Sequence, residues 1–254
     1  HLVSLYEEQL ATSARHGKED IGIVLQLAMV HWKMRAKADV AEPFFDKLRK
    51  VEPAHPGMLA FFRETLGARH DYGKLTQVLT DAQRSLPDGL ARSQIAAEIA
   101  KLSEEGANAS KAIEQWRALL RQDPGHTQAR DALKRLYKQT GAYNALAELL
   151  RSELERVPAG DAESRLPLLR EIAGIYREHV KSESALLAAL TQIAQLAADD
   201  ADTVRELVRV YDALGRVRDL LAAQARLAEI ETEPSVKAEL HRQVARRWLE
   251  QFSN

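Results

Sequence analysis

Two kinds of segment alternate along almost the whole sequence, and each kind returns after about 72 residues. The first kind has characteristic residues at Leu133, Tyr137, Gly141 and Leu146, and the same residue types recur at Leu207, Tyr211, Gly215 and Leu220. The second kind carries a small residue, which stands at Ala28, Ala100, Ala173 and Ala245. One such segment cannot bury its own apolar side chains, so neighbouring segments must bury them. The chain is therefore expected to fold as a stacked array of similar units.

The segment 127–157 indicates what one unit looks like. Leu133 and Leu136 belong to an apolar set with three- and four-residue spacing, which places its members on one face of a helix. A second set with the same spacing begins at Leu146. Gly141 lies between the two sets and can adopt the left-handed conformation that ends a helix. The unit is therefore predicted to be a pair of antiparallel helices, which we call a hairpin.

This pattern predicts six hairpins flanked by two unpaired helices, about 14 helices in all. The hairpins are expected at about 21–53, 58–87, 90–124, 127–157, 163–198 and 202–231. The unpaired helices are expected at about 2–14 and 236–252. No linker rich in Gly, Pro or Ser interrupts the series. We therefore expect a single repeat domain over residues 1–254, as a fragment of a longer array.

Several positions in two of these hairpins agree with a known repeat pattern. In 90–124 the agreeing positions are Ala100, Ala112, Trp116 and Pro124. In 127–157 they are Leu133, Tyr137, Gly141, Tyr143 and Leu146, whereas Glu153 stands at a usually small position. On these residues the hairpins resemble tetratricopeptide repeats. The resemblance implies an all-α, right-handed superhelical α-solenoid whose first helices line a concave groove, and a non-catalytic scaffold that binds proteins or peptides there.

Composition limits the partners and the compartment. The 254 residues carry a formal net charge of −1, which gives no overall attraction to nucleic acid or to an anionic membrane. Cysteine is absent, so disulfides and thiolate chemistry are excluded. No apolar run approaches the roughly 20 residues that span a bilayer. We expect no direct membrane insertion and favour a cytoplasmic location, while a periplasmic or extracellular location stays open.

A row of basic residues on the predicted first helices is the candidate partner-binding site. Its members are Arg135, Lys138, Arg170, Arg177, Arg205, Arg209, Arg242 and Arg246. If the first helices line a groove, this row would favour an acidic peptide or a terminal carboxylate. The alternative is a solvated helix face on which Arg pairs with Asp and Glu. We favour that alternative for any single arginine, and the row as a group is the better evidence for binding.

The aromatic residues are assigned mainly to the core. Trp32 and Met29 could form an apolar pocket for a partner's side chain. Packing against a neighbouring helix is the interpretation that we favour for both residues. Core positions are also predicted for Trp116, Tyr137, Tyr176, Tyr211 and Trp248.

Motifs for catalysis, cofactors and metals are missing from the sequence. The histidines show no HExxH or similar ligand spacing, so we predict no metal, no cofactor and no enzyme. One alternative is an RNA-associated helical-repeat protein, although the near-neutral charge does not favour nucleic acid. A second alternative is the substrate-recognition arm of a larger enzyme. We expect a monomer, or weak self-association through exposed end helices.

Overall fold

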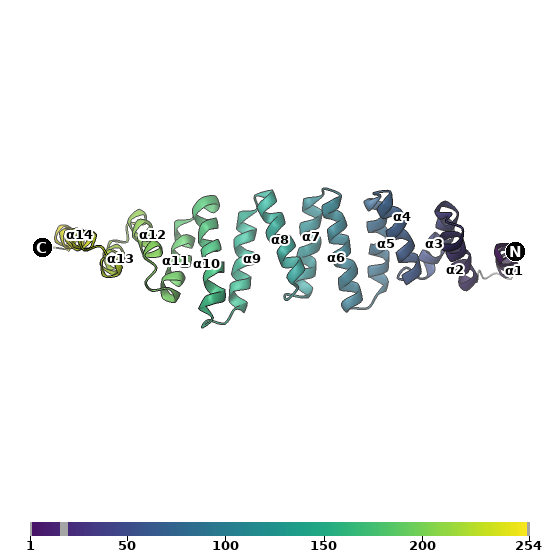
Figure 1. Cartoon of the computed structure of the whole chain (residues 1–254), viewed down its shortest axis with the longest axis horizontal. Coiled ribbons are helices and arrows are strands. Elements are labelled where there is room, and N and C mark those ends of the chain that lie inside the picture. Colours follow the sequence, from purple (N-terminus) through teal and green to yellow (C-terminus); the bar gives the residue numbers. More distant parts are fainter. Residues whose placement is uncertain (1, 16–19, 253–254) are drawn as a thin grey trace. The chain divides into compact units, whose positions relative to one another are not determined.

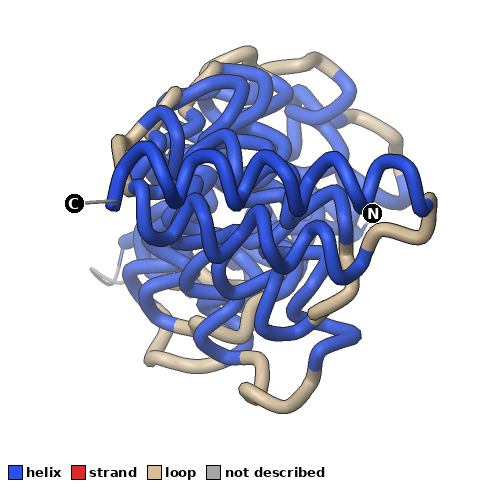
Figure 2. The backbone as a smooth tube through the Cα atoms, turned by 90° about the vertical axis from the view of Figure 1, so that its left-hand side faces the viewer, coloured by secondary structure: helices blue, strands red, loops and turns tan. Residues whose placement is uncertain are grey.

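A computed structural model describes residues 2–15 and 20–252, and every regular element in these residues is a helix (Figure 2). The first helices of the repeat are α2 (Ile21–Met29), α4 (Pro56–Ala68), α6 (Leu90–Glu105), α8 (Thr127–Thr140), α10 (Ala162–Ile175), α12 (Ala201–Ala213) and α14 (Pro234–Phe252). The second helices are α1 (Leu2–Arg15), α3 (Ala38–Val51), α5 (Tyr72–Ser85), α7 (Ala109–Gln122), α9 (Tyr143–Arg156), α11 (Glu183–Leu196) and α13 (Val217–Ile230). The described residues thus contain the predicted 14 α-helices.

The chain forms two compact units, and the boundary between them falls between Leu136 and Tyr137, inside α8. In the N-terminal unit each helix from α1 to α7 packs against the next one along the chain (Figure 1). In the C-terminal unit the same holds from α9 to α14. Contacts are therefore made between neighbours in sequence, as expected for a repeat array.

The core of the N-terminal unit contains a cluster of aromatic rings. Phe45 stacks on Phe61 with ring centroids 4.3 Å apart, and Trp32 meets Phe61 edge-on at 5.5 Å. Both phenylalanines are fully buried and Trp32 is only 7% exposed. Offset and edge-on pairs of this kind add to the stabilisation from burial. Trp32 is therefore a core residue, and the partner pocket considered for it is not formed.

Most of the other characteristic residues are buried as predicted. Ala28, Ala100 and Ala173 are inaccessible or nearly so, which lets neighbouring helices approach closely. Trp116, Tyr137 and Tyr176 are buried as well. Two assignments to the core are wrong: Tyr211 is only partly buried and Trp248 is 54% exposed. α14 packs against α13, and this packing leaves more than half of the Trp248 side chain exposed.

Each of the six hairpins turns through one residue with a positive φ angle. These residues are Ala36 (51°), His70 (53°), Ala107 (54°), Gly141 (69°), Lys181 (54°) and Gly215 (65°). The prediction that Gly141 ends its helix in the left-handed conformation is confirmed. Residues with a side chain adopt this conformation only at a cost. Four of the six turns bear that cost.

Two first helices end in a wider, π-helical turn. α2 continues into η1 (Val30–Met34) and α10 continues into η2 (Tyr176–Val180). The backbone N–H of Arg35 donates to the carbonyl of Val30, five residues earlier, at 3.1 Å. Such turns hold an extra residue relative to an α-helix and are uncommon. The wider turn η1 contains a buried histidine, His31, which is 3% exposed.

Candidate functional site

Charged side chains connect each first helix to the next in the N-terminal unit. Glu64 of α4 accepts hydrogen bonds from Trp32 Nε1 and from Lys33 Nζ, both at 3.1 Å. These two bonds hold the pKa of the Glu64 carboxyl below its ordinary value. Arg63 of α4 donates to both carboxylate oxygens of Glu98 on α6, at 2.8 and 2.7 Å. Such paired bonds fix geometry as well as charge.

Glu104 of α6 makes the third connection. It accepts a hydrogen bond from Trp116 Nε1 at 2.6 Å and one from Arg135 Nη2 at 2.5 Å. Arg135, a predicted partner-binding residue, is therefore already paired with a carboxylate that is only 16% exposed. We call the contacts of this type inter-hairpin ion pairs.

The C-terminal unit repeats the arrangement with other residues of the predicted basic row. Its inter-hairpin ion pairs join Lys138 to Glu171 at 2.7 Å, Arg177 to Glu206 at 2.8 Å and Arg170 to Asp200 at 3.1 Å. Asp200 also caps α12 by accepting a hydrogen bond from the backbone N–H of Thr203. Burial acts to raise the pKa of Asp200, but the bonds from Thr203 and Arg170 outweigh it and the pKa lies below its usual value.

The remaining predicted residues divide into two groups. Arg205 pairs with Asp202 at 2.7 Å and with Glu231 at 3.5 Å, and Arg242 pairs with Glu239 at 3.0 Å. Arg209 and Arg246 are exposed, and no carboxylate in the described part of the chain lies within ion-pair distance of either. Most of the row is thus neutralised within the protein, so the charge available to a partner resides mainly on Arg209 and Arg246.

Two adjoining hollows lie along α6 and α8 in the N-terminal unit. One has a volume of about 650 Å³ and the other of about 540 Å³, and both are lined by Lys101 and Gln128. Gln94 and Ala97 extend the surface toward the start of α6, and Asp131 extends it along α8. The polar groups are amides, hydroxyls and charges of both signs, and carboxylates outnumber the basic groups. Such a surface suits an extended peptide better than a strongly charged ligand.

A smaller hollow lies between α10 and α12 in the C-terminal unit. Its volume is about 340 Å³, and its walls carry Arg170, Arg177, Asp200 and Glu206. These four side chains form the ion pairs described above, so the lining is close to neutral. The pairing depends on how neighbouring hairpins pack, because the paired residues lie about one hairpin apart.

Other kinds of site find no support within the described residues. No group of three or more His, Asp or Glu side chains is placed so that it could hold a metal ion. None of the described helices has the length and apolar character needed to cross a bilayer.

Comparison with known proteins gives structural matches only. No family model and no curated protein matches the sequence. A mutant of MamA matches over 68% of this chain and 97% of its own, at 14% identity and a TM-score of 0.36. YrrB, described as a TPR protein with an unusual peptide-binding site, matches over 92% of this chain and 97% of its own, at 9% identity and a TM-score of 0.36. A tetratricopeptide repeat protein from Parabacteroides merdae matches over 94% of this chain and 91% of its own, at 13% identity and a TM-score of 0.37.

The class of the fold is defined by the hairpins themselves. Successive antiparallel helix pairs, buried alanines at Ala28, Ala100 and Ala173, and a left-handed residue in every hairpin turn define it. The protein is an all-α fold of the tetratricopeptide-like α-solenoid class, as the sequence predicts.

Proposed function

We propose that the protein is a scaffold for protein interactions and that it binds an extended segment of a partner along its first helices. The observation that carries this proposal is the pair of adjoining hollows on α6 and α8, which share Lys101 and Gln128. The side-chain amides of Gln94 and Gln128 can each donate to and accept from a peptide backbone. A preformed array loses little conformational freedom when it binds such a segment.

An acidic character of the bound segment is part of the proposal for the C-terminal unit. Arg209 on α12 and Arg246 on α14 are exposed guanidinium groups without a carboxylate partner in the described residues. Guanidinium groups bind carboxylates in a fork geometry, so these two positions favour Asp, Glu or a chain terminus in the partner. Arg205 is less suited to this role because it already pairs with two carboxylates.

Affinity capture from a lysate of the source cell tests the proposal. The unmodified protein is compared with a Gln94→Ala and Gln128→Ala double variant and with an Arg209→Glu and Arg246→Glu double variant. Gln122→Ala and Arg121→Glu serve as matched controls, because both residues are exposed on the second helix α7. We expect a discrete protein that the controls retain and at least one double variant loses.

The pattern of loss identifies the contact. Loss in the glutamine variant assigns binding to the α6 and α8 surface. Loss in the arginine variant, with weaker salt dependence of what remains, assigns an acidic segment to Arg209 and Arg246. Equal capture by all variants contradicts the proposal, and capture of material that a nuclease removes supports the RNA-associated alternative instead.

A further inference from the structure

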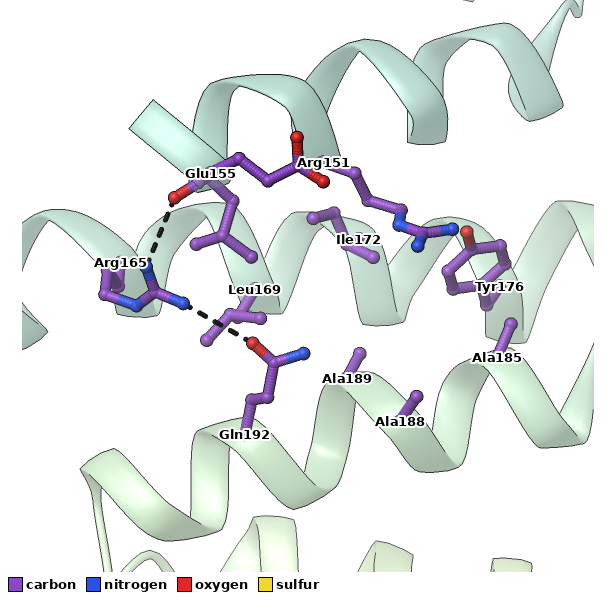
Figure 3. Close-up of a pocket in the computed structure, with 11 residues that line it drawn as sticks. Arg151, Glu155, Arg165, Leu169, Ile172, Tyr176, Ala185, Ala188, Ala189 and Gln192 are labelled. Atoms are coloured by element: carbon purple, nitrogen blue, oxygen red, sulfur yellow. Dashed lines mark hydrogen bonds between the residues drawn. The ribbon is translucent and has the colours of Figure 1, made fainter. Parts of the chain in front are cut away.

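A pocket opens on a different side of the C-terminal unit, between the second helices α9 and α11 (Figure 3). Its volume is about 230 Å³ and its floor is formed by α10. The α10 residues that form the floor include Leu169 and Ile172, which are 1% and 2% exposed. Arg170 of α10 and Arg177 of η2, which continues it, form ion pairs with Asp200 and Glu206 and line the hollow beside α12 instead. The pocket is therefore separate from the surface proposed above.

The pocket exists because α11 presents three alanines toward α9, with Gln192 at one end. Ala185, Ala188 and Ala189 form its α11 wall, and Ala188 is exposed. Another pair of successive second helices, α3 and α5 in the N-terminal unit, is by contrast bridged by Glu42 with Lys74 at 2.5 Å. No ion pair joins α9 directly to α11 in the described residues. The gap between these two helices is thus left open by the protein itself.

One end of the pocket is fixed by Arg165 of α10. Its Nη1 donates to the carbonyl oxygens of Leu154 at 3.2 Å and Val157 at 3.0 Å, at the end of α9. Its Nη2 donates to Gln192 Oε1 of α11 at 3.5 Å. An arginine that satisfies the last carbonyls of a helix stabilises that helix end. Arg165 therefore holds the pocket in shape, and its charge is already engaged.

The other end of the pocket carries an available charge. In Figure 3 the side chain of Arg151 extends over the pocket toward Tyr176. Arg151 is exposed, and the described residues offer it no ion-pair or hydrogen-bond partner. Tyr176 is buried, so the Arg151 guanidinium lies at the boundary between an apolar floor and solvent. Glu155, four residues further along α9, also lines the pocket, so an acidic group is favoured only beside Tyr176, where partial shielding from water strengthens its attraction to Arg151.

The size of the pocket limits what can occupy it. Pockets for drug-sized ligands and cofactors enclose roughly 300 to 1,000 Å³, whereas this one encloses about 230 Å³. A pocket of this size, with an apolar floor and a polar rim, suits a single large side chain, which is how anchor residues of protein partners bind. We propose that the pocket between α9 and α11 is a docking site for a protein partner that inserts one large apolar side chain and places a neighbouring Asp or Glu on Arg151.

Selection of peptides tests this docking site. A phage library of random 12-residue peptides is selected on the complete protein, and the enriched peptides are synthesised for affinity measurements. Ala188→Leu fills the pocket from an exposed position, and Arg151→Glu reverses the charge at its rim. Gln195→Leu adds the same side chain on α11 outside the pocket, and Arg156→Glu makes the same charge change on α9 outside the pocket. Circular dichroism confirms that each variant remains folded.

We expect enriched peptides in which a large apolar residue lies next to Asp or Glu. Ala188→Leu and Arg151→Glu should each weaken their binding at least tenfold, whereas Gln195→Leu and Arg156→Glu should change it less than twofold. Peptides that bind Ala188→Leu as well as the unmodified protein would overturn the proposal, as would a selection that enriches none. Peptides lost only in the Gln94→Ala and Gln128→Ala variant would support the first-helix surface and overturn this one.

Discussion

The turn residues of the hairpins adopt a left-handed backbone conformation whether or not they are glycine. Gly141 and Gly215 do so freely, but Lys181 has a φ of 54° and Ala107 has the same value. A side chain in this conformation costs about 1–2 kcal/mol relative to its absence. Glycine avoids this cost, but it also gives the unfolded chain more conformational freedom, which offsets part of the gain in stability.

Replacing Lys181 with glycine is therefore expected to stabilise the C-terminal unit. We expect Lys181→Gly to raise the free energy of unfolding by about 0.5–1 kcal/mol. Lys181→Ala is the control, because it removes the long side chain but keeps the strained conformation. Urea denaturation measures the difference, and the prediction fails if the alanine variant is as stable as the glycine variant.

A buried histidine makes the stability of the N-terminal unit sensitive to pH. His31 is 3% exposed, stacks on Phe44 at 5.8 Å, and has no hydrogen-bond partner for either ring nitrogen within the described residues. Burial lowers the pKa of His31 below 6.5, Arg35 and Lys37 act in the same direction, and Glu7 opposes them. The unfolded chain therefore binds a proton at this residue before the folded chain does.

The sign of the effect follows from this difference. Stability from His31 is fully present above pH 6.5 and is lost as the pH falls from 6.5 toward the lower pKa of the folded state. We expect His31→Leu to flatten the pH dependence of the urea midpoint in that interval, whereas His241→Gln, at an exposed position, leaves it unchanged. Equal pH profiles for the unmodified protein and His31→Leu would refute this expectation.

At the scale of the helices, the inter-hairpin ion pairs add to the apolar contacts that connect one first helix to the next. Arg63 and Glu98 share two hydrogen bonds, and their side chains are 41% and 29% exposed. Exposed pairs contribute about 0.2–1 kcal/mol, and good bidentate geometry favours the upper end of that range. Arg242 and Glu239 lie within one helix and are more exposed, at 74% and 51%.

A double-mutant cycle separates these two cases. For Arg63→Ala and Glu98→Ala we expect a coupling energy of about 1 kcal/mol. For Arg242→Ala and Glu239→Ala we expect about 0.3 kcal/mol, since solvent screens the exposed pair. Thermal or urea unfolding of the four single and two double variants provides the measurement. A larger coupling energy for Arg242 and Glu239 than for Arg63 and Glu98 would contradict the expectation that the inter-hairpin pair is the stronger one.

The helices and the turn at Gly141 could be predicted because both depend on nearby residues. Apolar spacing defines a helix face over a few turns, and glycine marks a left-handed turn by its type. Lys181 could not be recognised as a turn residue, since lysine carries no such signal. The pairing of Arg135 with Glu104 depends on the packing of two hairpins, although an opposite charge about one hairpin away is a usable sign.

The pocket between α9 and α11 was also beyond prediction from the sequence. Ala188 is exposed, although it is the same residue type as its neighbour Ala189, which is buried. Only the positions of α9 and α10 decide that this part of α11 faces a gap. Exposure of Trp248 was missed for the same reason, because a helix pattern does not indicate which faces find a neighbour.

At the scale of the whole chain, contacts between neighbouring helices imply that destabilisation stays local. In such arrays stability is close to a sum over units and their interfaces. Trp116→Ala removes a fully buried side chain from α7 in the N-terminal unit. Hydrogen exchange should accelerate in α6 and α7 and remain unchanged in α12 and α13. Equal acceleration in both units would show that the chain unfolds as one cooperative body.

The π-helical turns have a consequence for how the chain tolerates changes in its length. Loss of one residue inside an α-helix rotates everything beyond it by about 100°, so buried side chains turn outward. η1 and η2 already hold one residue more than an α-helical turn requires. Removing one residue there would restore an α-helix while the hairpin turn at Ala36 or Lys181 keeps its place. Single-residue deletions between relatives of this protein are therefore expected to accumulate at these two helix ends.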